Sequence, residues 1–250
     1  MMEPLKKVDE QALVTDILMG DYRTADIFKK YNIDYCCGAR WPLQTACEIR
    51  GLDTGQVKQE LEDAVRSVTV STALPFDQWP LDFVADYIVH IHHTYLRQTF
   101  PALGTHLAHF IAEHRQKFPW LDEIEQQFKR LHAQMLLLMI QEEESIFPYI
   151  KQMNRAYSSS DVLAGLYTRT LRKPVEMVIE QEYLLVYDVL QRMRKLTDNY
   201  TLPANACRSH YVVFMKLREL DNDLVQHLFL ENNILLPRVL TIESELKKMG

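Results

Sequence analysis

An imidazole and a carboxylate share one face of an apolar helix near the end of the sequence. The stretch DLVQHLFLENNILLPRVL, residues 223–240, carries His227 and Glu231 four residues apart. Positions i and i+4 lie on the same helical face, and the surrounding leucines indicate that this face is buried. Burying polar groups costs free energy unless they find partners or a cation. The spacing therefore predicts either a satisfied polar pair or part of a metal site.

A second segment repeats part of this pattern. The sequence LMIQEEESIFPYI, residues 138–150, aligns with HLFLENNILLPRV, residues 227–239, so that Glu142 matches Glu231. Two glutamates at equivalent depth on facing helices could together bind metal ions. The repeat is incomplete, because the position that would carry the matching histidine is Leu138.

Further imidazoles occur in the segment VHIHHTY, which contains His90, His92 and His93. In an α-helix, His90 and His93 are neighbours at i and i+3, whereas His92 points elsewhere. At least one of the three is therefore expected to face the core. Histidine together with glutamate suits iron, manganese or zinc.

These residues require long helices to position them. Helical patterns extend over about residues 81–115, 120–153, 173–197 and 203–248. Long helices joined by short connections predict an up-down four-helix bundle, in which sites form from inward-facing side chains. Pro101 is expected to kink the first helix, and a break is expected near Pro237.

The N-terminal region has shorter elements. Helices are expected at about residues 9–19, 22–31, 43–50 and 55–66, with Thr54 as a cap of the last. The segment SVTVSTALPFDQWP, residues 67–80, lacks helical periodicity and contains two prolines. The predicted organisation is all-α, with a small helical domain at 1–66, a linker at 67–80 and a bundle at 81–250.

Composition narrows the functional classes. The chain has 250 residues and a formal net charge of −6, which argues against a nucleic-acid surface. No apolar run is long enough to span a membrane, and the start MMEPLKKVDE lacks the apolar segment of a signal peptide. A cytoplasmic protein with reduced thiols is expected. The usual short motifs of hydrolases and P-loop enzymes are absent from the sequence, so a conventional enzyme is disfavoured.

Two adjacent cysteines, Cys36 and Cys37, form a second candidate site. As thiolates they could bind a soft metal, carry nitric oxide or exchange with a partner's disulfide. The alternative is that one is a small buried apolar residue and the other is incidental. Cys47 and Cys207 are expected to be structural.

Three segments together resemble the RIC family, whose members repair iron centres. They are YNIDYCCGAR at 31–40, EEESIFPYI at 142–150 and HLFLENNILLPRVL at 227–240. The resemblance covers nearly the whole chain and implies a small N-terminal domain followed by a hemerythrin-like bundle. It implies a non-haem di-iron centre in a cytoplasmic, stress-responsive protein, commonly a dimer. Such a protein would restore iron–sulfur clusters damaged by nitric oxide or oxidants, so its partners would be damaged iron–sulfur proteins or iron acceptors.

The resemblance also assigns ligands one by one. The family's ligand positions fall on His93, Glu142, His227 and Glu231 in this sequence. Two histidines of the family have no counterpart, because their positions are occupied by Leu138 and Tyr183. The family's CCGG motif is CCGA here.

These departures leave three states open for the bundle. It could hold one iron ion, a weakened di-iron pair with Tyr183 as a substitute ligand, or no metal. The functional hypotheses follow the same division: an iron-handling repair protein, a metal-free bundle that acts as an interaction or regulatory protein, or a sensor of oxygen or nitric oxide. Iron handling is the preferred hypothesis.

Overall fold

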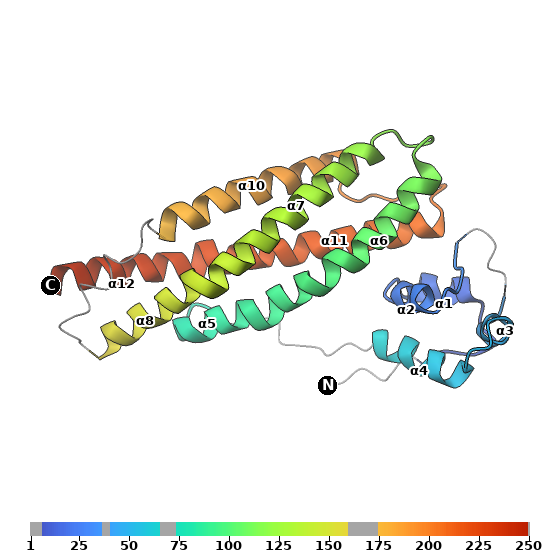
Figure 1. Cartoon of the computed structure of the whole chain (residues 1–250), viewed down its shortest axis with the longest axis horizontal. Helices are drawn as coiled ribbons and strands as arrows, with labels where there is room; N and C mark the ends of the chain where they lie inside the picture. The colour runs from blue at the N-terminus through green and yellow to red at the C-terminus, as the bar shows by residue number, and fades with distance from the viewer. Residues whose placement is uncertain (1–6, 37–40, 66–73, 160–174, 250) are drawn as a thin grey trace. The chain divides into compact units, whose positions relative to one another are not determined.

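The structure is a computed structural model that describes residues 7–36, 41–65, 74–159 and 175–249, with only the backbone described at 175–183 and 247–249. Helices dominate these residues (Figure 1), and the described part contains no strand beyond an isolated bridge between Leu13 and Pro42. The predicted all-α fold is confirmed. The chain divides into two compact units, which are described separately.

The first unit contains residues within 1–73, together with 105–114 and 200–218. Its short helices are α1 (Val14–Gly20), α2 (Thr24–Lys30), α3 (Leu43–Ile49) and α4 (Thr54–Ala64). Their apolar faces share one core, whose largest members are fully buried Phe28, Leu18, Leu43 and Leu61. The cap predicted at Thr54 is wrong by one residue, because the Asp53 carboxylate accepts a hydrogen bond from the backbone N–H of Gln56 at 2.8 Å.

The second unit contains residues within 74–104, 115–199 and 219–250. Four helical rods lie side by side in its described part (Figure 1). Their elements are, in chain order, α5 (Leu81–Tyr87), η1 (Ile88–His93) and α6 (Thr94–His114); α7 (Leu121–Gln141), η2 (Glu142–Ile146) and α8 (Phe147–Ser158); α10 (Val175–Leu196); and α11 (Arg208–Phe229), η3 (Leu230–Leu235) and α12 (Leu236–Met249). The end of α6 from residue 105 and the start of α11 up to residue 218 belong to the first unit. This is the predicted bundle, with an apolar core between the rods.

Three of these rods are interrupted by a π-helix, which the sequence patterns did not predict. The segments η1, η2 and η3 each have i→i+5 hydrogen bonding within an otherwise α-helical rod. Such segments are rare and occur frequently at functional sites. The chain stays helical where a break was expected near Pro237, since η3 ends at Leu235 and α12 begins at Leu236. Pro101 lies inside the continuous helix α6.

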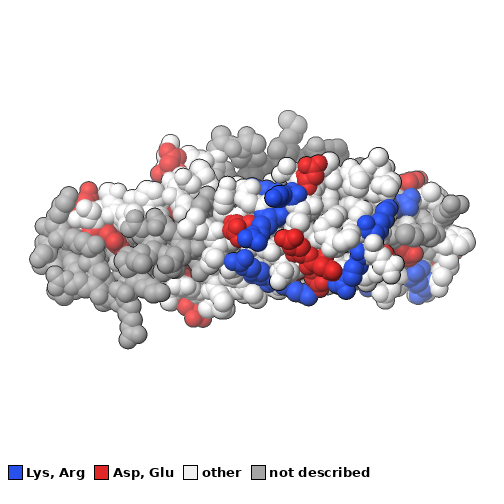
Figure 2. Space-filling model, turned by 90° about the horizontal axis from the view of Figure 1, so that it is seen from above, with Lys and Arg blue, Asp and Glu red and all other residues white. Residues whose placement is uncertain are grey.

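The surface shows charges of both signs. On the face in Figure 2, basic and acidic side chains are intermingled. Between α7 and α10, for example, Arg130 lies 3.8 Å from Asp188, which also pairs with Arg192 at 3.2 Å. This face therefore differs from the basic stripe that nucleic-acid binding requires. Among the described residues, every helix is too short or too polar to cross a bilayer.

Candidate metal centre

The π-helices position the residues that the sequence singled out. His93 is the last residue of η1, Glu142 is the first of η2, and Glu231 lies in η3, one turn after His227 at the end of α11. All four side chains are buried, with no more than 2% of any of them exposed. One ligand atom from each of His93, Glu142 and His227 lies within 4.8 Å of the others. The fold thus brings together all four predicted ligand positions.

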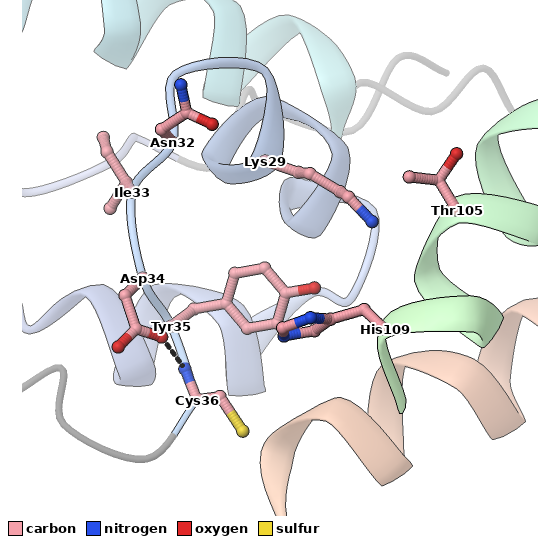
Figure 3. Close-up of a pocket in the computed structure, with 8 residues that line it drawn as sticks. All are labelled: Lys29, Asn32, Ile33, Asp34, Tyr35, Cys36, Thr105 and His109. Atoms are coloured by element: carbon pink, nitrogen blue, oxygen red, sulfur yellow. Dashed lines mark hydrogen bonds between the residues drawn. The ribbon is translucent and has the colours of Figure 1, made fainter. Parts of the chain in front are cut away.

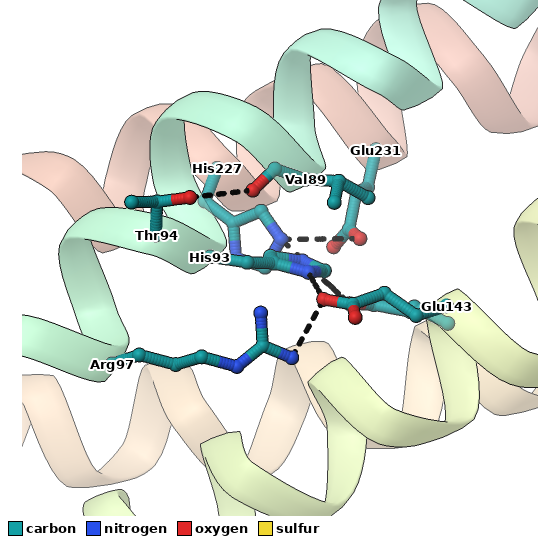
Figure 4. Close-up of polar contacts among 8 residues, drawn as sticks. Val89, His93, Thr94, Arg97, Glu143, His227 and Glu231 are labelled. Carbon is teal, nitrogen blue, oxygen red and sulfur yellow. Dashed lines mark hydrogen bonds and ion pairs between the residues drawn. The ribbon is translucent and has the colours of Figure 1, made fainter.

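A carboxylate outside the cluster orients the His93 ring (Figure 4). Glu143 Oε1 lies 2.6 Å from His93 Nδ1 and also accepts from Arg97 Nη2 at 2.8 Å. Because a carboxylate can only accept, the Nδ1 nitrogen must carry the proton. The opposite nitrogen, Nε2, points at Glu142 Oε2 from 3.1 Å. This is the usual arrangement of a metal-binding histidine and its orienting carboxylate.

The second histidine approaches the same carboxylate. His227 Nε2 lies 3.3 Å from Glu231 Oε1 and 3.9 Å from Glu142 Oε2. Both carboxylates, from Glu142 and Glu231, therefore approach the same imidazole nitrogen.

Burial and neighbouring charges shift the pKa values of His93, His227 and Glu231 in different directions. Burial and the charge of His227 lower the pKa of His93 to about 4, so its ring is neutral near pH 7. Burial opposes protonation of His227 too, but the charge and hydrogen bond of Glu231 outweigh it and raise the pKa of His227. Glu231 in turn has its pKa lowered to about 2, because His227 offsets the effect of burial. Glu231 is therefore a carboxylate, and neutral His93 presents a lone pair to Glu142.

His92 is also buried, which the sequence pattern did not predict. An α-helical pattern separates His92 from His93, yet both are buried and His90 is exposed, because the wider π-helical turn changes which residues face inward. The His92 ring stacks on that of His227, with centroids 5.8 Å apart. Its Nδ1 lies 2.9 Å from Asp223 Oδ1, while its Nε2 has no hydrogen-bond partner among the described residues. Three histidines within the four positions 90–93 gave only a weak signal for this residue.

The resemblance predicts histidines at two positions that carry Leu138 and Tyr183 instead, and only the side chain of Leu138 is described. Leu138 is buried on α7, one turn before Glu142. Its side chain is apolar, so it needs no hydrogen-bond partner or metal ion at this buried position. Tyr183 lies in α10, at a position whose side chain is outside the described residues.

The donor set fits a metal ion. Neutral His93 directs a lone pair at the Glu142 carboxylate, the Glu231 carboxylate lies beside His227, and His227 Nδ1 has no hydrogen-bond partner among the described residues. Positive charge at the centre would satisfy these acceptors together. Imidazole and carboxylate ligands suit iron, manganese or zinc.

Of the two adjacent cysteines predicted as a second site, Cys36 lies among the described residues. Cys36 is buried at the end of the segment after α2, and its backbone N–H donates to Asp34 Oδ1 at 2.8 Å. Its Sγ lies 3.3 Å from Ser209 Oγ. Cys37 lies outside the described residues.

Comparison with known proteins defines the class. A family model described as hemerythrin HHE cation binding domain matches residues 84–239, which is more than half of the chain. The chain therefore belongs to the hemerythrin HHE cation-binding family. A second model, described as a domain of unknown function (DUF542), matches residues 10–65.

Individual relatives extend over nearly the whole chain. The iron-sulfur cluster repair protein YtfE of Enterobacter sp. (strain 638) is 28% identical, with 91% of this chain and 96% of the relative covered. The iron-sulfur cluster repair protein ScdA of Staphylococcus haemolyticus (strain JCSC1435) is 24% identical, with 91% and 97% covered. A probable iron-sulfur cluster repair protein of Haemophilus influenzae is 27% identical, with 86% and 90% covered. The resemblance seen in the sequence motifs is confirmed.

Proposed function

We propose that this chain binds non-haem iron in the bundle and serves iron–sulfur cluster repair. The observation that carries the proposal is the buried convergence of His93, Glu142, His227 and Glu231. The names of the relatives support the repair role. On this proposal its partners are damaged iron–sulfur proteins or iron acceptors in the cytoplasm, and the protein acts as a homodimer.

Each residue of the site has a part in the proposed function. His93 and His227 supply imidazole nitrogens, and Glu142 supplies the carboxylate that lies between them. Glu231 balances positive charge next to His227. Glu143 and Arg97 hold the His93 ring in the orientation that directs Nε2 inward. When bound, iron supplies a Lewis-acidic, redox-active centre that can be exchanged with an acceptor.

We propose one ion as the resting content, with water completing its coordination. Four ligand groups suffice for one ion, whereas a di-iron pair would lack the histidines replaced at Leu138 and Tyr183. His92, held by Asp223, is the nearest additional imidazole, since its ring stacks on His227.

Elemental analysis of protein purified without oxygen tests the proposal. We expect about one iron per chain, lost in His227→Ala but retained in His90→Ala, whose imidazole is exposed on η1, the π-helix that also contains His93. Two irons per chain would overturn the single-ion assignment. No metal in folded wild-type protein after iron loading would overturn iron handling and favour the metal-free interaction protein.

A further inference from the structure

The first unit contains a pair of cysteines that lie far apart in the sequence. The Sγ atoms of Cys36 and Cys207 both contact Ser209 Oγ, at 3.3 Å and 3.1 Å respectively. The Ser209 hydroxyl is thus a shared partner of the two thiols. Cys207, which the sequence analysis treated as structural, therefore joins the DYCC segment to the start of α11 within this unit.

Several hydrogen bonds hold the two thiols together. Arg208 Nη1 donates to the carbonyl oxygen of Cys36 at 3.1 Å, and Asp34 accepts from its backbone N–H. The neighbouring Tyr35 hydroxyl lies 3.0 Å from His106 Nδ1. The segment that carries Cys36 is thus fixed on both sides, which keeps its thiol within reach of Cys207.

The two thiols have different surroundings. Cys36 is buried, whereas Cys207 is half-buried and contacts His114 Nε2 at 3.3 Å. Hydrogen bonds from Cys36 and Ser209, with the charge of His114, outweigh burial and lower the pKa of Cys207 to about 4. Thiolates, not thiols, attack disulfides. Cys207 is therefore suited to attack and Cys36 to resolve the product.

A cavity beside Cys36 leaves room for a small reactant. It has a volume of about 440 Å³ and is bordered by Cys36, Lys29 and His109 among others (Figure 3). In the close-up, Lys29 and His109 extend across from the segment that carries Cys36. These nitrogen-bearing side chains are suited to a small molecule with carboxylate groups.

We propose that Cys36 and Cys207 form a redox-active dithiol that exchanges with small, carboxylate-bearing disulfides. The Cys207 thiolate attacks one sulfur of the disulfide, forms a mixed disulfide and releases one thiolate. Cys36 then passes its proton to the released thiolate, and the resulting Cys36 thiolate attacks Cys207 Sγ and releases the second thiolate. The small disulfide is reduced by two electrons, and the protein gains a Cys36–Cys207 disulfide.

This inference goes beyond iron handling and is tested separately from it. Full-length protein, kept without oxygen, is equilibrated with glutathione disulfide, quenched by alkylation and mapped by peptide mass spectrometry. We expect a Cys36–Cys207 cross-link, while buried Cys47 stays a thiol and serves as an internal control. In Cys36→Ser we expect the mixed disulfide to accumulate on Cys207, because no resolving thiol remains.

The alternatives give distinct results. A cross-link between Cys37 and Cys207, or persistent separate thiols in excess disulfide, would overturn the proposal. Circular dichroism shows whether the Cys36→Ser variant is folded, and the mapping of wild-type protein does not depend on that variant. His227→Ala should form the same cross-link even without iron, so a failure of the metal site and a failure of the dithiol remain distinguishable.

Discussion

Replacing His227 and Glu231 together should have the opposite effect on stability from replacing Glu231 alone. Both side chains are almost fully buried and lie 3.3 Å apart. In Glu231→Ala, His227 loses the neighbour that raises its pKa and remains in the core. Removing one partner of a buried ion pair costs about 3–5 kcal/mol. For a chain of this size that corresponds to a fall in Tm of about 6–20 °C.

In the double variant His227→Leu, Glu231→Leu, neither charge remains. Replacing a buried ion pair by apolar residues of similar volume is neutral or stabilising by about 1–4 kcal/mol. Leucine also has a high helix propensity, so the end of α11 should be preserved. In the presence of a chelator, this variant should therefore be at least as stable as wild-type protein.

Addition of metal should make wild-type protein more stable than the double variant, which reverses their order in chelator. At a ferrous ion concentration of about 100 times Kd, wild-type protein gains about 2.7 kcal/mol, whereas a variant without a site gains nothing. Urea unfolding followed by circular dichroism, without oxygen and with either chelator or iron, measures both effects. If the double variant were as unstable as Glu231→Ala in chelator, or were stabilised equally by iron, the account of this pair as a metal site would be refuted.

Two further predictions concern other residues. Leu138→His, one turn before Glu142, should lower the stability of the metal-free protein by about 1–3 kcal/mol but raise the iron content measured by elemental analysis, and unchanged iron content would contradict the predicted ligand position. Burial raises the pKa of Asp26, but hydrogen bonds from His106 and Lys216 outweigh it and lower this pKa from 3.8 to about 2. The stabilisation from Asp26 should therefore be complete above pH 3.8 and be lost as the pH falls towards about 2. The difference in urea midpoint between wild type and Asp26→Asn should shrink over this range, and a constant difference would contradict it.

Much of the bundle could be predicted from local patterns. The apolar periodicity of each rod spans ten or more residues, and the His227–Glu231 pair follows directly from the repeat of one helical turn. The predicted rods end within a few residues of the observed ones. The domain boundaries at 66 and 80 stay a prediction, because contacts group residues 105–114 and 200–218 with the N-terminal helices.

Other features depend on contacts between distant residues. Cys36 meets Ser209 across 173 positions, so no local pattern could have paired it with Cys207. The buried position of His92 depends on a π-helical turn, whose hydrogen bonds are selected by packing and not by residue type alone. The sequence signal was limited to the presence of the histidines.

Two prolines, Pro148 and Pro237, closely follow the π-helices that contain the buried glutamates. A proline inside a helix clashes with the carbonyl of the residue four positions earlier and removes one hydrogen bond. For Pro148 and Pro237, that carbonyl belongs to Glu144 and Asn233, which lie inside η2 and η3. The changed hydrogen bonding in these segments accommodates both rings.

The same segments contain Glu142 and Glu231, so the irregular backbone coincides with the buried carboxylates. A bundle selected for packing alone would gain stability from regular helices and apolar residues at these positions. The combination of π-helices, buried carboxylates and a histidine oriented by Glu143 is therefore costly without a cation. This physical cost favours a bound metal ion over a hydrogen-bonded remnant, even though Leu138 stands where the resemblance leads one to expect a histidine ligand.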